Sequence, residues 1–271
     1  MNMIGSIAQT TEILKKYNLK AKKKYGQNFL ISAAVIDKII SLIDDQTTVI
    51  EVGVGLGAIT EQLCLKAKQV IAYEIDRQLY DILQDNLKFS NLRLYNEDFL
   101  KVDLKNIISE IDGKIAFVSN LPYYITTQIL TNVFLNCSKI DVVVTMMQKE
   151  VANRFMKQKA DKEYNSLQVL AQYCADVQVL SKVNRNNFIP APNVDSVILT
   201  FKIKQGLNDE TIQSFYDFLG KCFLHRRKCV LTNLTNEGIK FNSEKLLDLQ
   251  DKRVEQLNLT DYLRIYEEIQ K

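Results

Sequence analysis

The chain has 271 residues, of which 46% are hydrophobic and 25% are charged, and its formal net charge is +3. This length allows one large domain, or one of about 200 residues with a small appendage. Only 9 glycines and 3 prolines are present, which excludes a long linker or a low-complexity tract. No apolar stretch is long enough to cross a bilayer and no signal-peptide pattern opens the chain, so we expect a cytoplasmic protein without a membrane partner.

The cysteine and histidine content argues against a metal site. Five cysteines are scattered along the chain without a C-x-x-C pair, and the single histidine, His225, has no partner at metal-ligand spacing. We therefore expect reduced, mostly structural thiols and no bound metal.

Positive charge gathers in two places. Residues 1–24 carry six lysines and one glutamate, which predicts a basic N-terminal tail. A second group near the C-terminus consists of Lys221, Arg226, Arg227 and Lys228. Basic clusters in an otherwise near-neutral chain indicate a polyanionic partner, although a charge run by itself is usually a solvated face.

Beyond the tail, the apolar spacing of 33–43 predicts a helix, with Ser32 as its N-cap. An alternation of Val/Ile-rich runs and amphipathic segments then begins. The runs predict strands over 48–52, 69–73, 91–95, 115–119, 141–147, 177–183 and 194–203. The segments between them predict helices over 58–65, 78–87 and 125–135.

This alternation indicates a mostly parallel sheet with helices on both faces. The last two strands lie close together with proline-containing turns between them, which favours an antiparallel edge. After residue 205 only short helices are expected. The sequence thus predicts a doubly wound α/β domain over 25–205 and a small helical domain over 206–271.

A glycine-rich turn follows the first predicted strand, with the spacing Gly53-x-Gly55-x-Gly57. Glycines at a strand-to-helix turn let the backbone approach a ligand, and the helix N-terminus favours anionic groups. Glu74 ends the second strand, where a carboxylate could accept hydrogen bonds from ribose hydroxyls. Asp98 follows the third strand and could accept from an adenine amino group.

Each of these two carboxylates also has a purely structural interpretation. Glu74 could be a solvated loop side chain, and Asp98 could cap a helix. NAD fits the loop and the two acids, and so does a nucleoside with a sulfonium tail. No acid, base or metal suited to the nicotinamide side is apparent.

Asn120-Leu121-Pro122-Tyr123 follows the fourth strand at the same edge of the sheet. The side-chain oxygen of Asn120 and the backbone carbonyl of Pro122 could accept both N–H groups of an exocyclic adenine amine and so aim its lone pair. Tyr123 could stack on the base, which is worth about 1–3 kcal/mol. Methyl transfer there would rest on positioning and electrostatics rather than on a titrating side chain. The alternative is a turn in which Asn120 caps the next helix.

In this order, the motifs resemble those of the ribosomal RNA small-subunit adenine N6,N6-dimethyltransferase family (KsgA/Dim type). The resemblance extends from about Lys22 to the C-terminus. It is carried by Lys24-Tyr25-Gly26-Gln27-Asn28-Phe29-Leu30, the 51–57 loop, Glu74-Ile75-Asp76, Glu97-Asp98, Asn120-Leu121-Pro122-Tyr123 and Phe188-Ile189-Pro190-Ala191-Pro192-Asn193-Val194-Asp195-Ser196.

The resemblance implies a Rossmann-like class I methyltransferase fold with a seven-stranded sheet, and S-adenosylmethionine as cofactor. It implies cofactor contacts for Asn28 and Leu30 (methionine end), Gly53 (carboxylate), Glu74 (ribose), Asp98 (adenine) and Asn120 (junction with the target). Phe188 would face Tyr123 across the target base, although a core aromatic is an equally ordinary role. RNA contacts are implied for Lys221, Arg226, Arg227 and Lys228.

Members of this family place two methyl groups on each of two adjacent adenines in the 3′-terminal hairpin of small-subunit rRNA. The implied partner is therefore 16S rRNA in the immature small subunit, and nothing in the sequence demands more than a monomer. Three alternatives stay open: the large-subunit rRNA dimethyltransferases that confer macrolide resistance, a non-catalytic nucleic-acid-binding or transcription factor on the same fold, and a nicotinamide-dependent oxidoreductase. The form of 120–127 and 190–196 favours the small-subunit enzymes.

Overall fold

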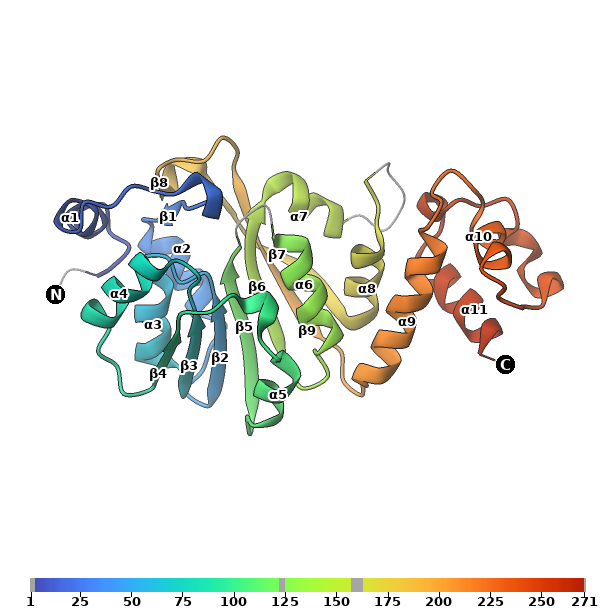
Figure 1. The fold of residues 1–271 in the computed structure, drawn as a ribbon, viewed down its shortest axis with the longest axis horizontal. Helices are drawn as coiled ribbons and strands as arrows, with labels where there is room; N and C mark the ends of the chain where they lie inside the picture. The colour runs from blue at the N-terminus through green and yellow to red at the C-terminus, as the bar shows by residue number, and fades with distance from the viewer. Residues whose placement is uncertain (1–2, 122–124, 157–162, 271) are drawn as a thin grey trace.

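The computed structural model describes residues 3–121, 125–156 and 163–270 (Figure 1). At its centre is a seven-stranded sheet in the order β4-β3-β2-β5-β6-β9-β7. The strands are β2 (Thr47–Val52), β3 (Gln69–Tyr73), β4 (Leu92–Tyr95), β5 (Lys114–Asn120), β6 (Val142–Gln148), β7 (Ala175–Val183) and β9 (Ser196–Ile203). The predicted seven-stranded sheet is confirmed, and every strand end lies within two residues of its expected position.

Six strands of this sheet run in the same direction, and β9 runs opposite to them. β2 pairs in parallel with β3 and β5, β3 with β4, and β5 with β6. β9 lies antiparallel between β6 and β7, as the short connection predicted. The chain moves outward from β2 through β3 to β4 and then returns to β5 on the other side of β2. Ligands of such sheets bind at the carboxyl ends of the strands beside this reversal.

Helices cover both faces, so the doubly wound architecture is confirmed (Figure 1). On one face, α2 (Ala33–Ile40), α3 (Ala58–Lys66) and α4 (Arg77–Asn86) pack over inward-facing residues such as Val49 and Val118. On the other, α5 (Leu104–Ser109), α6 (Thr126–Leu135), α7 (Lys149–Met156) and α8 (Ser166–Cys174) pack over residues such as Ile50 and Phe117. Ser32 stands at the N-cap of α2 but makes no side-chain cap hydrogen bond.

Helices alone follow residue 205, as predicted. They are α9 (Asp209–Cys222), α10 (Val230–Asn236), the short 3-10 helices η4 (Ser243–Leu249) and η5 (Val254–Gln256), and α11 (Leu259–Ile269). Their apolar residues continue the core that covers one face of the sheet. The rings of Phe215 on α9 and Tyr173 on α8, for example, have centroids 4.5 Å apart. The helical region therefore extends the α/β core rather than forming a separate one.

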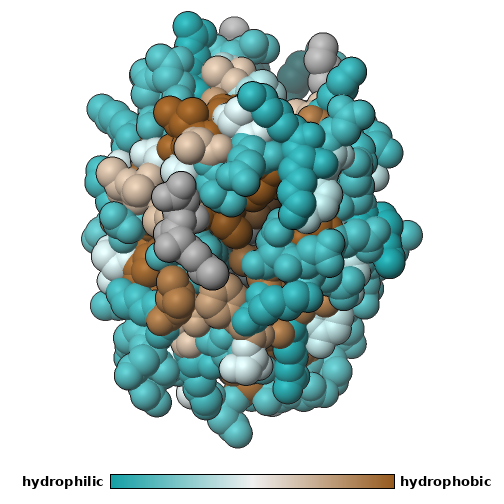
Figure 2. All heavy atoms as spheres, turned by 90° about the vertical axis from the view of Figure 1, so that its left-hand side faces the viewer, coloured by the Kyte–Doolittle hydropathy of each residue, from teal (hydrophilic) through white to brown (hydrophobic). Residues whose placement is uncertain are grey.

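The N-terminal region is folded where the structure describes it, whereas a basic tail was expected over 1–24. α1 (Ile7–Lys16) is capped by Ser6 and buries Ile13, while the backbone N–H of Ile4 donates to Glu61 Oε2 at 2.9 Å. The apolar residues at helical spacing bind this segment to the core, and Lys15 and Lys16 remain exposed. Figure 2 looks onto this end of the molecule and shows a mostly hydrophilic surface with hydrophobic side chains gathered near its middle. The helix is thus amphipathic, which the lysine count alone conceals.

Within the described part of the chain, no helix combines the length and apolar character needed to cross a membrane.

Candidate cofactor and target-base site

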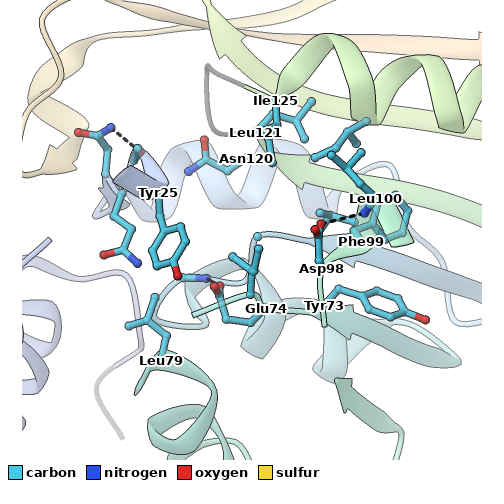
Figure 3. Close-up of a pocket in the computed structure, with 18 of the residues that line it drawn as sticks. Tyr25, Tyr73, Glu74, Leu79, Asp98, Phe99, Leu100, Asn120, Leu121 and Ile125 are labelled. Atoms are coloured by element: carbon cyan, nitrogen blue, oxygen red, sulfur yellow. Dashed lines mark hydrogen bonds between the residues drawn. The ribbon is translucent and has the colours of Figure 1, made fainter. Parts of the chain in front are cut away.

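A pocket opens at the carboxyl edge of the sheet, and the empty space within it, together with the open solvent at its mouth, is about 860 Å³. Its walls come from the turn after β2, the ends of β3, β4 and β5, and the N-terminal residues 25–29 (Figure 3). The predicted site residues that line it are Asn28, Gly53, Glu74, Asp98, Asn120 and Phe188. Segments separated by up to 160 residues in the sequence therefore meet at one pocket.

The glycine turn presents bare backbone to this pocket. Gly53 and Gly55 line it with φ of 78° and 64°, in the left-handed region that favours glycine. Gly57 has φ of 90°, and a Cβ there would lie 3.0 Å from the side chains of Leu83 and Leu87. The first two glycines thus open room for a ligand, and the third allows α3 to pack closely on α4.

Glu74 is a buried carboxylate at the pocket floor. Its side chain accepts hydrogen bonds from the backbone N–H of Gly55 and from that of Asp76, each at 2.9 Å. Burial raises the pKa of Glu74 to about 7, although these backbone donors oppose the shift. With only 4% of its surface exposed, the interpretation as a solvated loop side chain is wrong.

Glu51 is a second buried carboxyl group, and the sequence indicates no separate role for it beyond its place in the strand. It lies on β2, in register with Ala72 of β3, and is 2% exposed. Its Oε2 has no hydrogen-bond partner among the described residues, and burial raises its pKa to about 8. The group is thus mainly protonated at neutral pH, which limits the negative charge beside the glycine turn.

Asp98 caps a helix and also lies at the pocket, while its contact with an adenine amino group stays a prediction. Its Oδ1 accepts from the backbone N–H of Leu100 at 3.1 Å and so caps the short 3-10 helix η2 (Phe99–Lys101). The same half-buried carboxylate lines the pocket. Leu100 and Ile75 line the pocket as well, with 39% and 41% of their surfaces exposed. Two apolar side chains next to the acidic motifs suit the faces of a planar ring, a signal that the polar motifs alone did not supply.

Asn120 is the last residue of β5, and Figure 3 shows it across the pocket from Glu74. It does not cap the following helix, because the N-cap of α6 is Ile125. Leu121 continues from it, with its backbone N–H donating to Met146 O at 3.1 Å. Pro122 and Tyr123, the other residues predicted for catalysis, lie outside the described residues.

Phe188 reaches the pocket through a second, two-stranded sheet. β1 (Phe29–Leu30) pairs antiparallel with β8 (Phe188–Ile189), which places Leu30 opposite Phe188. Phe188 is 4% exposed and lines the pocket. Leu30 is 3% exposed, packs in the core and is not among the residues that line the pocket, and its expected cofactor contact stays a prediction. Asn28 lines the pocket, and its side chain donates to Gly26 O at 3.0 Å.

The C-terminal basic cluster is not part of this pocket. Lys221 lies on the last turn of α9, and Arg226, Arg227 and Lys228 are exposed in the turn to α10. The side chain of Asn233 on α10 holds this turn by donating to Cys222 O and His225 O, at 2.8 and 3.1 Å. Figure 1 places these helices and the pocket elements β1 and α4 at opposite ends of the molecule.

Neither thiols nor metal ligands form a second centre in what the structure describes. All five cysteines are free thiols. Among the described residues, no group of three or more His, Cys, Asp or Glu side chains could hold a metal ion.

The fold and the site together define a class I, S-adenosylmethionine-dependent methyltransferase: a doubly wound sheet, a glycine cradle after β2, and buried or capping carboxylates after β3 and β4. The pocket fits that cofactor, since Gly53 and Gly55 present backbone without a side chain to it and Glu74 offers a buried hydrogen-bond acceptor. A sequence profile of the ribosomal RNA adenine dimethylases matches residues 18–271. The chain belongs to this family.

Individual relatives agree with this placement. The chain is 41% identical over 273 residues to ribosomal RNA small subunit methyltransferase A of Streptococcus mutans, covering 94% of each chain. It is 41% identical over 239 residues to the protein of the same name from Levilactobacillus brevis, covering 85% of this chain and 81% of the relative. Among solved structures, a dimethyladenosine transferase from Plasmodium falciparum matches with a TM-score of 0.71 and 25% identity, over 89% of this chain and 97% of the other. The 23S rRNA methyltransferase ErmE shares the fold, with a TM-score of 0.69 and 24% identity, over 90% and 100% of the two chains.

Proposed function

We propose that this protein methylates N6 of two adjacent adenines in the 3′-terminal hairpin loop of 16S rRNA, giving N6,N6-dimethyladenosines in the immature small ribosomal subunit. We further propose that it acts in the cytoplasm as a monomer. The observation that carries the proposal is the position of Asn120 at the end of β5, across one pocket from the buried Glu74 (Figure 3). This arrangement places a hydrogen-bond acceptor for a target amine opposite one for a cofactor.

Three regions of the pocket each bind a different part of the cofactor. The Glu74 carboxylate accepts from the ribose hydroxyls, and Asp98 accepts from the adenine amino group. Gly53 and Asn28 bind the methionine end, because both line the pocket, the first with bare backbone and the second from the N-terminal segment. S-adenosylmethionine supplies a methyl group on a positively charged sulfur, which makes the methyl carbon electrophilic.

The target adenine enters beside Asn120. Its amino group donates to the side-chain oxygen of Asn120 and to the carbonyl of Pro122, which directs the nitrogen lone pair toward the methyl carbon. Tyr123 and Phe188 stack on the two faces of the base, a contact worth about 1–3 kcal/mol per base. Because no side chain must gain or lose a proton for the methyl group to move, catalysis rests on orientation and electrostatics.

The basic cluster positions the RNA through contacts with its phosphates. A base must leave its stack to reach the pocket, which favours a hairpin loop over a duplex. Phosphate contacts at Lys221, Arg226, Arg227 and Lys228 would hold RNA on the helices that lie at the opposite end of the molecule from β1 and α4 (Figure 1), so the bound RNA would have to extend from these helices to the pocket. A folded subunit provides such an extended partner.

The choice of small-subunit over large-subunit rRNA is supported by the curated relatives. Those at 41% identity bear the name ribosomal RNA small subunit methyltransferase A. The likeness to ErmE, at 24% identity, concerns the fold alone.

The deciding experiment supplies purified protein and labelled S-adenosylmethionine to immature small subunits and, separately, to naked large-subunit rRNA. Mass spectrometry of the digested RNA locates N6,N6-dimethyladenosine. We expect two adjacent dimethylated adenines in the 3′-terminal hairpin of 16S rRNA and no product in the large-subunit RNA. Product only in the large-subunit RNA would overturn the substrate assignment, and RNA binding without any transfer would favour the non-catalytic alternative.

A further inference from the structure

Asp76 is a buried acidic side chain that follows the ribose-side acid by two residues and has no role in the site described above. It is 3% exposed and stands at the N-cap of α4. Its Oδ1 accepts from Lys22 Nζ at 2.8 Å and from the backbone N–H of Gln78 at 3.1 Å. Its Oδ2 accepts from Gln27 Nε2 at 2.8 Å. One carboxylate therefore joins α4 to two side chains that lie about 50 residues earlier in the sequence.

Those two side chains bracket the segment that covers the pocket. Gln27 Oε1 accepts from the backbone N–H of Lys22 at 2.8 Å, so that Lys22, Gln27 and Asp76 form a closed ring of hydrogen bonds. Between them lies the short 3-10 helix η1 (Lys23–Tyr25), and Tyr25, Gly26, Gln27 and Asn28 all line the pocket. Figure 3 shows the Tyr25 ring directed into the pocket toward Glu74. The ring of hydrogen bonds thus fixes one wall of the cofactor pocket.

The backbone of Asp76 acts on the side of the pocket that Glu74 forms. Its N–H donates to Glu74 Oε1 at 2.9 Å, while Gly55 holds Oε2. The residue whose side chain anchors the N-terminal segment therefore also orients the ribose-side carboxylate. A shift of α4's first turn would disturb both walls together.

The electrostatics favour a permanent link. Burial alone would raise the pKa of Asp76, but the hydrogen bonds from Lys22, Gln27 and the Gln78 backbone outweigh it and the pKa is lowered. Asp76 is consequently charged at neutral pH, and its salt bridge to Lys22 is partly shielded, with side-chain exposures of 35% for Lys22 and 4% for Asp76. A buried charge of this kind strongly favours the conformation that keeps its partners in place.

We propose that Asp76 is a positioning residue for the cofactor: it couples the closure of residues 22–28 over the pocket to the orientation of Glu74. The proposal uses the family's cofactor and does not depend on which rRNA is the substrate. It predicts that the Lys22–Asp76–Gln27 ring controls cofactor affinity and the opening of the N-terminal segment, while the methyl-transfer step at Asn120 is unaffected once the cofactor is bound.

The primary test is Asp76→Asn. The oxygen of the new amide can still accept from Lys22 and Gln78. Its NH₂ group, however, faces the NH₂ group of Gln27, and two donors cannot form a hydrogen bond, so the ring is broken at this point. We expect S-adenosylhomocysteine to bind about tenfold more weakly, KM for S-adenosylmethionine to rise by a similar factor, and kcat at saturation to stay within about twofold. Hydrogen exchange of 22–28 should accelerate, and added S-adenosylhomocysteine should slow it less than in the native protein.

A compensating second substitution distinguishes a role of Asp76 in positioning the cofactor pocket from a general loss of stability. In Asp76→Asn/Gln27→Glu the new amide donates to the new carboxylate, which still accepts from the backbone of Lys22, so the ring is restored with its polarity reversed. We expect most of the lost affinity and exchange protection to return. Asp81→Asn is the matched control on the same helix: its side chain is 54% exposed and pairs with Arg77, and we expect no change. Gln27→Ala, which leaves the Lys22–Asp76 pair intact, provides the same readouts if Asp76→Asn does not fold.

Unchanged affinity for S-adenosylhomocysteine and unchanged hydrogen exchange in Asp76→Asn would overturn the proposal, as would weakened binding without faster hydrogen exchange of 22–28. If adding the Gln27→Glu substitution does not restore cofactor affinity, the role of Asp76 is merely structural and the proposal is wrong. Binding and exchange are measured without RNA, so a failure of the 16S rRNA assignment would leave these results intact and distinguishable.

Discussion

Asn120 and Glu74 reach the pocket from β5 and from the end of β3, the two strands that flank β2. Each is polar, and each is placed by backbone that is part of the sheet or bonded to it. Glu74 is held by two backbone N–H groups, and Asn120 is itself the last ladder residue, opposite Met146. Side chains fixed by secondary structure need little reorganisation during a reaction, which suits catalysis by orientation.

We expect Asn120→Ala to lower methyl transfer by at least about 10²-fold, because the target amine loses a positioned acceptor. Cofactor affinity should change by less than about threefold, since Glu74 and the glycine turn remain. Single-turnover transfer from labelled S-adenosylmethionine and equilibrium binding of S-adenosylhomocysteine measure the two effects. Asn106→Ala, at an exposed position on α5, is the control. Near-normal turnover in Asn120→Ala would refute the assigned role.

Cofactor affinity should depend on pH through Glu74. Burial raises the pKa of Glu74 to about 7, and only the ionised carboxylate can accept both ribose hydroxyls. Binding of S-adenosylhomocysteine should therefore tighten about tenfold between pH 6 and pH 8, measured by calorimetry. The free protein responds in the opposite sense: its folded state holds a proton that the unfolded chain releases near pH 4.5, so this group costs stability as pH rises toward 7.

Two variants check that assignment. Glu74→Gln should bind weakly at every pH and remove the pH dependence. Glu51→Gln removes the other buried carboxyl group, whose pKa of about 8 overlaps the same range, and should leave the dependence in place. If the pH dependence of cofactor affinity disappears in Glu51→Gln but not in Glu74→Gln, it arises from Glu51 and the assignment to Glu74 is wrong.

At the scale of elements, the site depends on short segments that only packing holds together. β1 and β8 have two residues each, and their pairing brings Phe188 beside the N-terminal segment. Ahead of them, α1 is bound to the core through its buried side chains. Short elements gain their stability from such tertiary contacts rather than from their own propensity.

The docking of α1 can be tested with two substitutions of the same residue type on one helix. Ile13 is 4% exposed and Ile7 is 63% exposed. We expect Ile13→Ala to cost about 2–4 kcal/mol of local or global stability, and Ile7→Ala to cost less than about 1 kcal/mol. Urea unfolding measures the global part, and hydrogen exchange of 7–16 measures local opening. Equal effects of the two substitutions would mean that the segment behaves as a tail.

At the scale of the whole molecule, the helices that carry the basic turn and the pocket elements β1 and α4 lie at opposite ends of the long axis (Figure 1). The two regions nevertheless share a continuous core, because α9 packs on α8 and α6 beside the sheet. If the turn binds phosphates as proposed, a rigid spacing between it and the pocket would select RNA by shape, since phosphate contacts position without reading sequence.

Arg226→Gln/Arg227→Gln should weaken association with small-subunit RNA and flatten its salt dependence. Each lost phosphate contact lowers the slope of log K against log salt by about 0.7–0.9, so the pair should lower it by up to about 2. Lys66→Gln/Lys68→Gln removes the same charge from exposed positions around the end of α3 and should leave the slope unchanged. Binding titrations over a range of salt concentrations measure this. An unchanged slope in the arginine variant would exclude the turn from the interface.

Much of this protein could be predicted from local sequence. Strand positions followed from Val/Ile runs, because strands buried on both faces must be apolar throughout. The glycine turn, Glu74, Asp98 and Asn120 were identifiable as a group because parallel strands place their carboxyl ends at one edge. Helices such as α8 were missed, although Asn165 and Gln168 form a capping box at its start. The apolar residues of α8 lie on more than one face of the helix, which obscures the helical spacing in the sequence.

Only the tertiary structure decided the rest. Glu74 is buried rather than solvated, the N-terminal segment is folded rather than a tail, and Leu30 lies in the core rather than in the pocket. The Lys22–Asp76 salt bridge joins residues 54 apart in the chain, and the β1–β8 pairing joins residues about 160 apart. Such contacts depend on which surfaces meet when the chain packs, and no local pattern of charge or hydrophobicity specifies that. The residues of the site were therefore evident from sequence, whereas their burial, their partners and the wall that closes over them were determined by the fold.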